Sequence, residues 1–248
     1  EDGKPVDFAS FPIGSLSLYR RCVKKELLDE AGNWHEFDWF GQLGQKEYEA
    51  SSVSVRFTYE LATQPLSSCR MTYTVAEDAS IKVELDYDAV EGLPEIPDFA
   101  MLFTLPADYD QVRFYGYGPL DNYADRQRGA RLGIFETTAK DEVEPYLQPQ
   151  ETGNHGGIRW IEVTDHRGRG VRLAMDEEPF EASALPYSAH ELENARHPYD
   201  LPEVHHTFLR ASLSQCGVGG DDTWGAPVLP EYTVKNETKH FSFYFKGI

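Results

Sequence analysis

The sequence predicts an all-β protein, built as a sandwich of antiparallel sheets. Several stretches alternate apolar and polar residues with a period of two, which is typical of strands that bury one face. Helical periodicity is scarce, and many strands with few helices favour a sandwich. Short turn signals separate the alternating stretches, and they lie at 31–33, 76–78, 165–170 and 235–239.

The first patterned stretch, 18–32, fits a helix, but its spacing is also compatible with a hairpin. In 80–90 isoleucine, valine, leucine and tyrosine alternate with charged residues, which predicts a half-buried strand. One short helix is expected at 188–197, where Ser188 can cap the first turn and Glu191 completes a capping box. Further strands are predicted at 52–61, 69–75 and 240–248.

The domain organisation is expected to be simple. The proline-rich stretch 91–99 is interpreted as a long connection between strands, and no internal repeat is present, so 15–248 should form one domain. Residues 1–14 are expected to be a linker remnant. They begin EDGKPVDFAS without an initiator methionine, which indicates a piece cut from a longer protein.

Charge and composition exclude some partners. The 248 residues carry a formal net charge of −19, which repels nucleic-acid phosphates and anionic membranes, so we expect neither as a partner. The chain shows no apolar run of membrane-spanning length and no signal peptide. Three cysteines without CxxC spacing argue against a zinc site and for reduced thiols in the cytoplasm; they are Cys22, Cys69 and Cys216.

The stretch 114–126 (FYGYGPLDNYADR) is dense in glycine, tyrosine and acids. Its GxG is no dinucleotide fingerprint, because a third glycine and a following helix are missing. Asp121, Asn122, Asp125 and Arg126 could bind a cation or a sugar. The residue chemistry favours the alternative, in which Asp125 and Arg126 pair with neighbours and pin the loop.

No catalytic motif is recognisable from spacing: a G-x-S-x-G elbow, a P-loop and HExxH are all missing. His155 could act as a general acid or base, but no partner is fixed by spacing, so it is interpreted as a solvent-facing loop residue. His205 and His206 are adjacent on a predicted strand and point to opposite faces, so one is expected to be buried and the other exposed.

The stretch GVGGDDTW (217–224) combines flexible glycines, two acids and a tryptophan. Asp221 and Asp222 would repel a phosphate and lack the spacing of a calcium loop. They can instead accept hydrogen bonds that fasten the loop, while the glycines allow unusual dihedrals. Trp224 then either stacks on a sugar or closes the core of the sandwich, and residue chemistry leaves both open.

Four ordered motifs, taken together, closely resemble the C-terminal domain, or small-chain region, of LacZ-type β-galactosidases of glycoside hydrolase family two. The likeness covers roughly 15–248 and implies a large antiparallel supersandwich of the galactose mutarotase type. The motifs are YGYGPLDNYADR, YLQPQETGNHGGIRW, SALPYSAHELENARHPYDLP and GVGGDDTWGAPVLPEY.

The resemblance implies that the catalytic glutamates lie on a preceding (β/α)8 barrel, so no catalytic residue is expected in this chain. It also implies that Trp224 forms a sugar platform in the active site, with Thr223 where the family has serine. No metal or cofactor is expected in this domain, and the parent enzyme is expected to use Mg and Na. The residues expected to support the loop are Gly219, Gly220, Asp221, Asp222, Asp125 and Arg126.

The leading hypothesis is therefore an accessory domain of a retaining β-galactosidase that hydrolyses β-D-galactosides such as lactose. Its expected partners are the barrel and other domains of the parent enzyme, the β-galactoside and, for the full enzyme, further copies of itself. Two alternatives are a carbohydrate-binding module and an aldose-epimerase-like enzyme on the same fold. The epimerase would use a histidine acid, chosen from His155, His190, His205 and His206.

Overall fold

The computed structural model describes residues 20–37, 52–222 and 224–248. The expected linker remnant at 1–14 and the expected role of Thr223 lie outside the described residues. Regular structure in the described part is almost entirely antiparallel strand, with fourteen strands and a single short α-helix. The predicted all-β class is confirmed.

The chain divides into two compact units. One contains Glu1–Pro94 and Asn236–Ser242, and the other contains Glu95–Lys235 and Phe243–Ile248. The last strand, β14 (Lys239–Gly247), contributes its first residues to the first unit and its last residues to the second. Compact units do not by themselves define domains, so the single domain stays a prediction.

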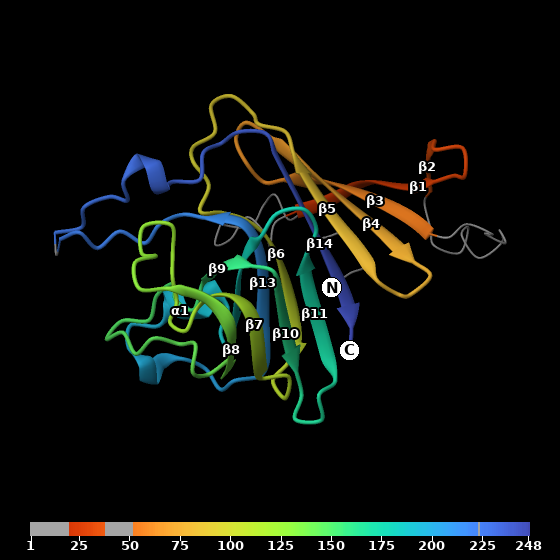
Figure 1. The fold of residues 1–248 in the computed structure, drawn as a ribbon. Coiled ribbons are helices and arrows are strands. Elements are labelled where there is room, and N and C mark those ends of the chain that lie inside the picture. Colours follow the sequence, from red (N-terminus) through yellow and green to blue (C-terminus); the bar gives the residue numbers. More distant parts are fainter. Residues whose placement is uncertain (1–19, 38–51, 223) are drawn as a thin grey trace, which may run out of the picture. The chain divides into compact units, whose positions relative to one another are not determined.

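The first unit is an antiparallel sheet with the strand order β2-β1-β3-β4-β5 (Figure 1). The turn between its first two strands has Gly32 in the left-handed region, at φ 83°, and the Asp29 carboxylate accepts the amide of Asn33 at 2.8 Å. The described part of the ambiguous stretch 18–32 is therefore a strand that leads into the turn of a hairpin, and not a helix. The strands are β1 (Arg20–Leu28), β2 (Trp34–Glu36), β3 (Ser52–Leu61), β4 (Ser67–Ala76) and β5 (Ile81–Tyr87).

The core of the first unit follows the predicted alternation. Val83, Leu85 and Tyr87 of β5 are buried, while the charged residues between them are partly exposed. Met71 of β4 lies opposite Leu85 and is also buried. One face of the sheet therefore carries the apolar core, as a period of two requires.

The second unit contains two antiparallel sheets. One has the order β14-β11-β10-β7-β8, and the other β6-β13-β12-β9. The strands of the first are β7 (Gln111–Gly118), β8 (Arg131–Thr138), β10 (Trp160–Thr164) and β11 (Gly170–Met175), with the end of β14. Those of the second are β6 (Asp98–Pro106), β9 (His155–Ile158), β12 (Phe180–Leu185) and β13 (His206–Gln215).

Aromatic side chains join the two sheets of the second unit. Phe103 of β6 lies 6.2 Å, between ring centroids, from Phe243 and 5.6 Å from Phe245, both on β14. Phe180 of β12 lies 6.2 Å from Phe243. These spacings are typical of packed aromatic pairs, and they make this unit a β-sandwich.

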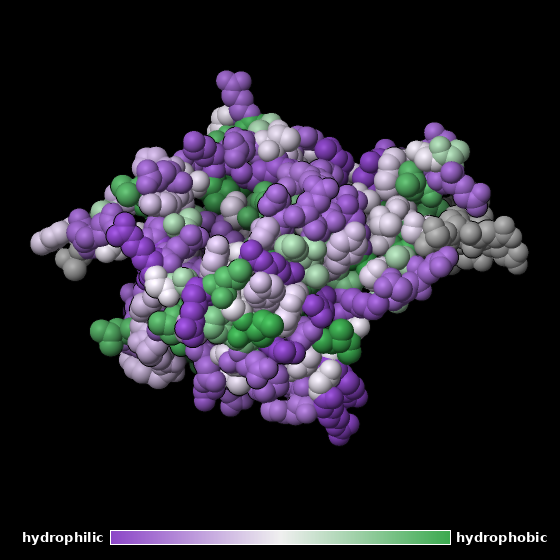
Figure 2. Space-filling view, in the orientation of Figure 1, coloured by the Kyte–Doolittle hydropathy of each residue, from purple (hydrophilic) through white to green (hydrophobic). Residues whose placement is uncertain are grey.

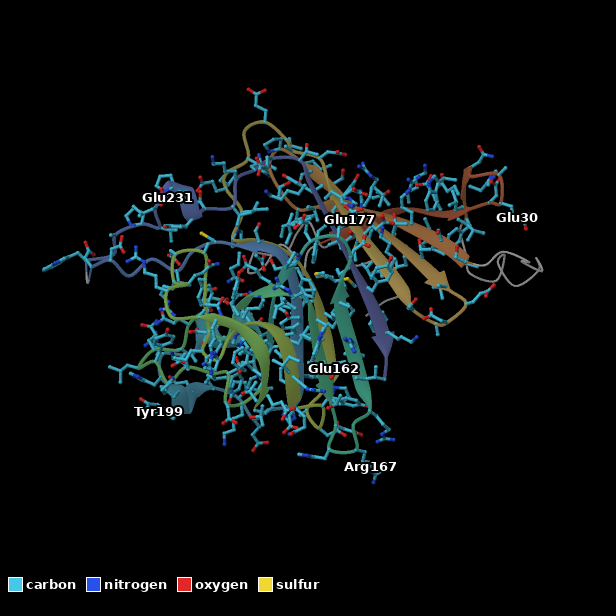
Figure 3. All side chains as sticks on the ribbon, viewed as in Figure 1. Glu30, Glu162, Arg167, Glu177, Tyr199 and Glu231 are labelled. Carbon is cyan, nitrogen blue, oxygen red and sulfur yellow. The ribbon has the colours of Figure 1, made fainter. Side chains whose placement is uncertain are left out.

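The predicted helix is α1 (Ala189–Asn194), and its capping box is confirmed. The Ser188 hydroxyl accepts the amide of Glu191 at 3.2 Å, and the Glu191 carboxylate accepts the amide of Ser188 at 2.7 Å. The 3-10 turns η4 (Pro198–Asp200) and η5 (Pro230–Tyr232) follow later in the chain. Figure 3 shows Tyr199 of η4 on the outside, and its side chain is exposed.

The surface is mostly hydrophilic on the face drawn in Figure 2, which agrees with the net charge of −19. The three cysteines carry free thiols. In the part of the chain that the structure describes, the helices are too short and too polar to span a bilayer.

Candidate functional site

A long loop, residues 216–229, connects β13 to η5, and backbone hydrogen bonds hold its first residues. The amide of Cys216 donates to the carbonyl of Pro97 at 2.8 Å, and the amide of Gly217 donates to the carbonyl of Tyr232 at 2.8 Å. Figure 1 shows this loop, in blue, reaching outward from the strands of its unit. Backbone hydrogen bonds therefore hold the base of the loop at Cys216 and Gly217.

Glycine is required at three positions near the base of this loop. Gly219 and Gly220 have φ of 65° and 87°, in the left-handed region that side chains rarely adopt. At Gly217 a Cβ would lie 2.5 Å from a carboxylate oxygen of Asp125. The sequence predicted that the glycines of this stretch form the bend. The structure shows in addition that the missing side chain of Gly217 leaves room for the Asp125 carboxylate.

Asp125 fastens the loop from a different part of the chain. Its Oδ2 accepts the amide of Gly219 at 2.7 Å, and its Oδ1 accepts the amide of Val218 at 3.2 Å. A carboxylate that accepts two backbone amides makes stronger bonds than neutral acceptors make. Asp125 was expected among the supporting residues, and the structure shows how it acts.

The two acids within the loop behave differently. Asp222 Oδ1 accepts the amide of Trp224 at 2.8 Å and that of Ala226 at 3.2 Å, which closes a tight turn. Asp221 is exposed and has no hydrogen-bond partner among the residues described. The fastening expected from Asp221 and Asp222 thus comes from Asp222 and, across the fold, from Asp125.

Trp224 is 92% exposed. A tryptophan that closes the core would be nearly buried, so the core alternative is wrong. Its backbone amide is held by Asp222, and the ring projects from an anchored turn. An indole in this position offers a large flat face at a small cost in conformational entropy, because it turns about only two side-chain bonds.

The stretch 114–126 is bonded to its own surroundings. The buried Asn122 donates to the carbonyl of Tyr117 at 2.9 Å and accepts the amide of Gly156 at 2.9 Å. Asp121 is 3.5 Å from the guanidinium of Arg126. These bonds agree with the pinned-loop interpretation, and they leave Asn122 with a structural role.

Arg126 lies beside two tyrosines. Its Nη2 and Nη1 are 3.4 and 3.5 Å from the hydroxyl of Tyr146, and its guanidinium carbon is 5.5 Å from the centroid of the Tyr123 ring. The bond to Tyr146, chiefly, raises the pKa of Arg126. These contacts are long, so the guanidinium can make further hydrogen bonds.

A partly buried charged cluster includes Glu151, which follows the stretch 145–150 in the same unit. Arg210 donates to Glu151 at 2.7 Å and lies 3.7 Å from Asp98. Glu181 accepts the side-chain amide of Asn154 at 2.7 Å. Burial raises the pKa of both Asp98 and Glu181. Sequence reasoning missed this cluster, because its members come from four separate stretches.

His155 is buried, at 2% exposure, so its interpretation as a solvent-facing residue is wrong. Its Nδ1 is 3.1 Å from the carbonyl oxygen of Tyr117, and its Nε2 is 2.6 Å from Glu142 Oε2. Since a carbonyl only accepts, the contact with Tyr117 requires that Nδ1 carries a hydrogen. His155 and Glu142 therefore form a closed internal contact. The sequence alone could not predict this contact, because it depends on how the strands pack.

The other candidate histidines are exposed. His205 and His206 are both exposed, so the expected split into one buried and one exposed residue is wrong. The reason is that β13 begins only at His206, and strand alternation does not extend to His205. His190 is exposed on α1. Within the described ranges, no cluster of three or more histidine, cysteine, aspartate or glutamate side chains could hold a metal.

The fold and the loop define a class of protein: a β-sandwich that presents an exposed aromatic ring on an anchored loop. The chain belongs to the beta galactosidase small chain family, whose model matches residues 11–245.

Relatives agree with this family. The chain is 42% identical to a beta-galactosidase of Halalkalibacterium halodurans, over 89% of this chain and 20% of that protein. It is 44% identical to beta-galactosidase BgaC of Bifidobacterium adolescentis, over 74% of this chain and 18% of that protein. It is 33% identical to the beta-galactosidase small subunit of Latilactobacillus sakei, over 78% of this chain and 64% of that subunit. The chain thus spans about a fifth of the length of the first two relatives.

Proposed function

We propose that this chain is the accessory, C-terminal region of a β-galactosidase of glycoside hydrolase family two. The names of its relatives support the activity, and their greater length supports a catalytic part outside this chain. The parent enzyme would hydrolyse terminal β-D-galactosides such as lactose with retention, using two carboxylates of its barrel. Mg and Na, if the parent uses them, would bind in those other parts. The free thiols support a reducing, cytoplasmic location.

In this proposal Trp224 forms one wall of the substrate site. The observation that carries it is an indole that is 92% exposed on a loop held by Asp125 and Asp222. An indole face stacks well on the apolar face of a pyranose ring. The loop holds the ring ready, so that little ordering is needed when the sugar binds.

The partners follow from the same proposal. The chain would pack on the catalytic barrel, on the same polypeptide or as a separate subunit like that of Latilactobacillus sakei. Copies of the full enzyme would assemble further. An epimerase has little support, because His155 is buried and His190, His205 and His206 make no bond to a carboxylate among the described residues.

Trp224→Ala in the complete enzyme tests the platform. We expect KM for lactose to rise roughly three- to tenfold, equivalent to about 0.5–1.5 kcal/mol of lost stacking, and Trp224→Phe to lose less. Tyr199→Ala is the matched control, because Tyr199 is also an exposed aromatic residue but lies on η4. Steady-state kinetics gives both constants. Equal KM values for the wild type and Trp224→Ala would rule the platform out.

A further inference from the structure

A cleft of about 450 Å³ opens beside the base of the Trp224 loop, in the second unit. Its volume falls in the range of roughly 300–1,000 Å³ that small-molecule sites occupy. One wall is the glycine-rich backbone of 217–220, and Trp224 is not part of the lining. The polar side chains that line the cleft are Arg126, Tyr146, Gln150, Glu151 and Gln215.

Gln215 is the unusual member of this lining. Its side chain is more than nine-tenths buried, yet its Oε1 has no hydrogen-bond partner among the described residues. Two more buried atoms nearby share this state, Arg210 Nε and Asn154 Oδ1. Buried polar atoms are nearly always bonded, so an acceptor left open at a cleft points to a partner from outside the chain.

Glu151 reaches the cleft from a fixed position. Arg210 donates to its Oε1 at 2.7 Å, and the hydroxyl of the buried Tyr123 donates to the same oxygen at 3.3 Å. Its Oε2 has only a long contact, 3.5 Å, with Arg210. The carboxylate is thus held in place by Arg210 and Tyr123 and retains an oxygen that can accept another hydrogen bond.

Two further lining residues supply donors. The guanidinium of Arg126 and the hydroxyl of Tyr146 lie 3.4–3.5 Å apart, so both can bond more strongly to a third group. With one guanidinium, one carboxylate and two amide side chains, the lining has no net charge. Such a lining, in a chain of net charge −19, does not favour an anion.

We propose that this cleft binds a neutral sugar, at a site separate from Trp224. Sugar hydroxyls donate and accept at once, so one ring can donate to Gln215 and Glu151 and accept from Arg126 and Tyr146. The glycine wall lets the sugar approach the backbone closely. The site does not depend on the proposed role of Trp224, because the chain supplies all of its groups.

The test is a titration of the isotope-labelled 248-residue chain, followed by amide NMR, with galactose, glucose and lactose, and with inorganic phosphate as the anionic probe. We expect saturable shifts at 215–220 with at least one sugar. Arg126→Gln and Tyr146→Phe should each weaken binding about three- to tenfold, as for one lost hydrogen bond. Arg128→Gln, which changes an exposed residue outside the lining, should bind as the wild type does.

Each contrary result is informative. Phosphate binding that exceeds sugar binding would overturn the proposal, as would the lack of saturable shifts with every sugar. Sugar binding that survives both cleft variants but disappears in Trp224→Ala would place the ligand on the loop instead. The amide spectrum of each variant shows whether it is folded. The KM of Trp224→Ala enzyme reports separately on the proposed function.

Discussion

Asp125 illustrates how much one side chain can organise. It accepts the backbone amides of Val218 and Gly219, which lie 93 and 94 positions later in the chain. Such a carboxylate removes the freedom of a glycine-rich segment that would otherwise sample many backbone states. Asp222 then repeats the same chemistry close to Trp224. Two aspartates therefore hold the segment that leads to the exposed indole.

Replacing Asp125 should loosen this loop. In Asp125→Ala we expect faster amide hydrogen exchange at Val218 and Gly219, and Asp125→Asn should show a smaller effect because one oxygen acceptor remains. In the complete enzyme, KM for lactose should rise more than kcat falls, since the residue positions Trp224 and touches no substrate.

Asp221→Ala is the matched control for Asp125→Ala, because Asp221 lies in the same loop and has no partner among the described residues. Exchange rates unchanged in Asp125→Ala would refute the anchoring role. The same conclusion would follow if Asp221→Ala loosened the loop as much as Asp125→Ala does.

The hairpin of β10 and β11 shows how an element depends on its turn. Asp165 Oδ1 accepts the amides of Arg167 and Arg169, at 2.8 and 3.0 Å, and its Oδ2 is 2.7 Å from the Arg169 guanidinium. These bonds, led by the amide of Arg169, lower the pKa of Asp165 to about 2. Figure 3 shows Arg167 at the end of this turn.

The lowered pKa gives a pH dependence with a defined sign. The folded pKa lies below the unfolded value of 3.8, so the stabilisation is complete above about pH 4 and disappears as pH falls towards 2. Asp165→Asn should therefore be less stable than the wild type at neutral pH, and the difference should shrink over that window. Urea unfolding at several pH values measures it.

Glu203→Gln is the control for Asp165→Asn, because Glu203 is exposed and makes no hydrogen bond among the described residues. Its unfolding midpoint should follow the wild type at every pH. A stability difference for Asp165→Asn that stays constant from neutral pH to about pH 2 would contradict the assigned role.

At the level of the whole molecule, the chain covers about a fifth of the length of its first relatives. Of the candidate histidines, His155 is buried against Glu142, and His190, His205 and His206 make no bond to a carboxylate among the described residues. We therefore expect the isolated 248-residue chain to leave a chromogenic β-galactoside intact, and the complete enzyme to hydrolyse it. Hydrolysis by the purified chain alone would overturn the accessory role.

Local features of the fold were predictable because they depend on neighbours in sequence. Alternation over 80–90 identified β5, and Ser188 with Glu191 identified the start of α1. The stretch 18–32 stayed ambiguous, since its pattern fits two structures. Pairing of β1 with β2 and β3 resolved it, because that pairing satisfies the backbone groups of a strand.

The candidate site was predictable only in part. Glycines 219 and 220 were recognisable as a bend, because positive φ is mainly accessible to glycine. The exposure of Trp224 was not, since a tryptophan suits a core and a binding surface equally well. His155 was misinterpreted for a similar reason: its partner Glu142 is near in sequence, but only the packing of β9 buries both.

Sequence alone was sufficient for the all-β class, for the strands at 52–61, 69–75, 80–90 and 240–248 and for the family resemblance, because periodicity and motif order are properties of the chain itself. Folding was needed to bring Asp125 to the 217–219 backbone, Arg210 to Glu151 and Gln215 to the wall of a cleft. These contacts join residues about 60 to 90 positions apart, and nothing local encodes such distances. They depend instead on which strands pair and which faces become buried.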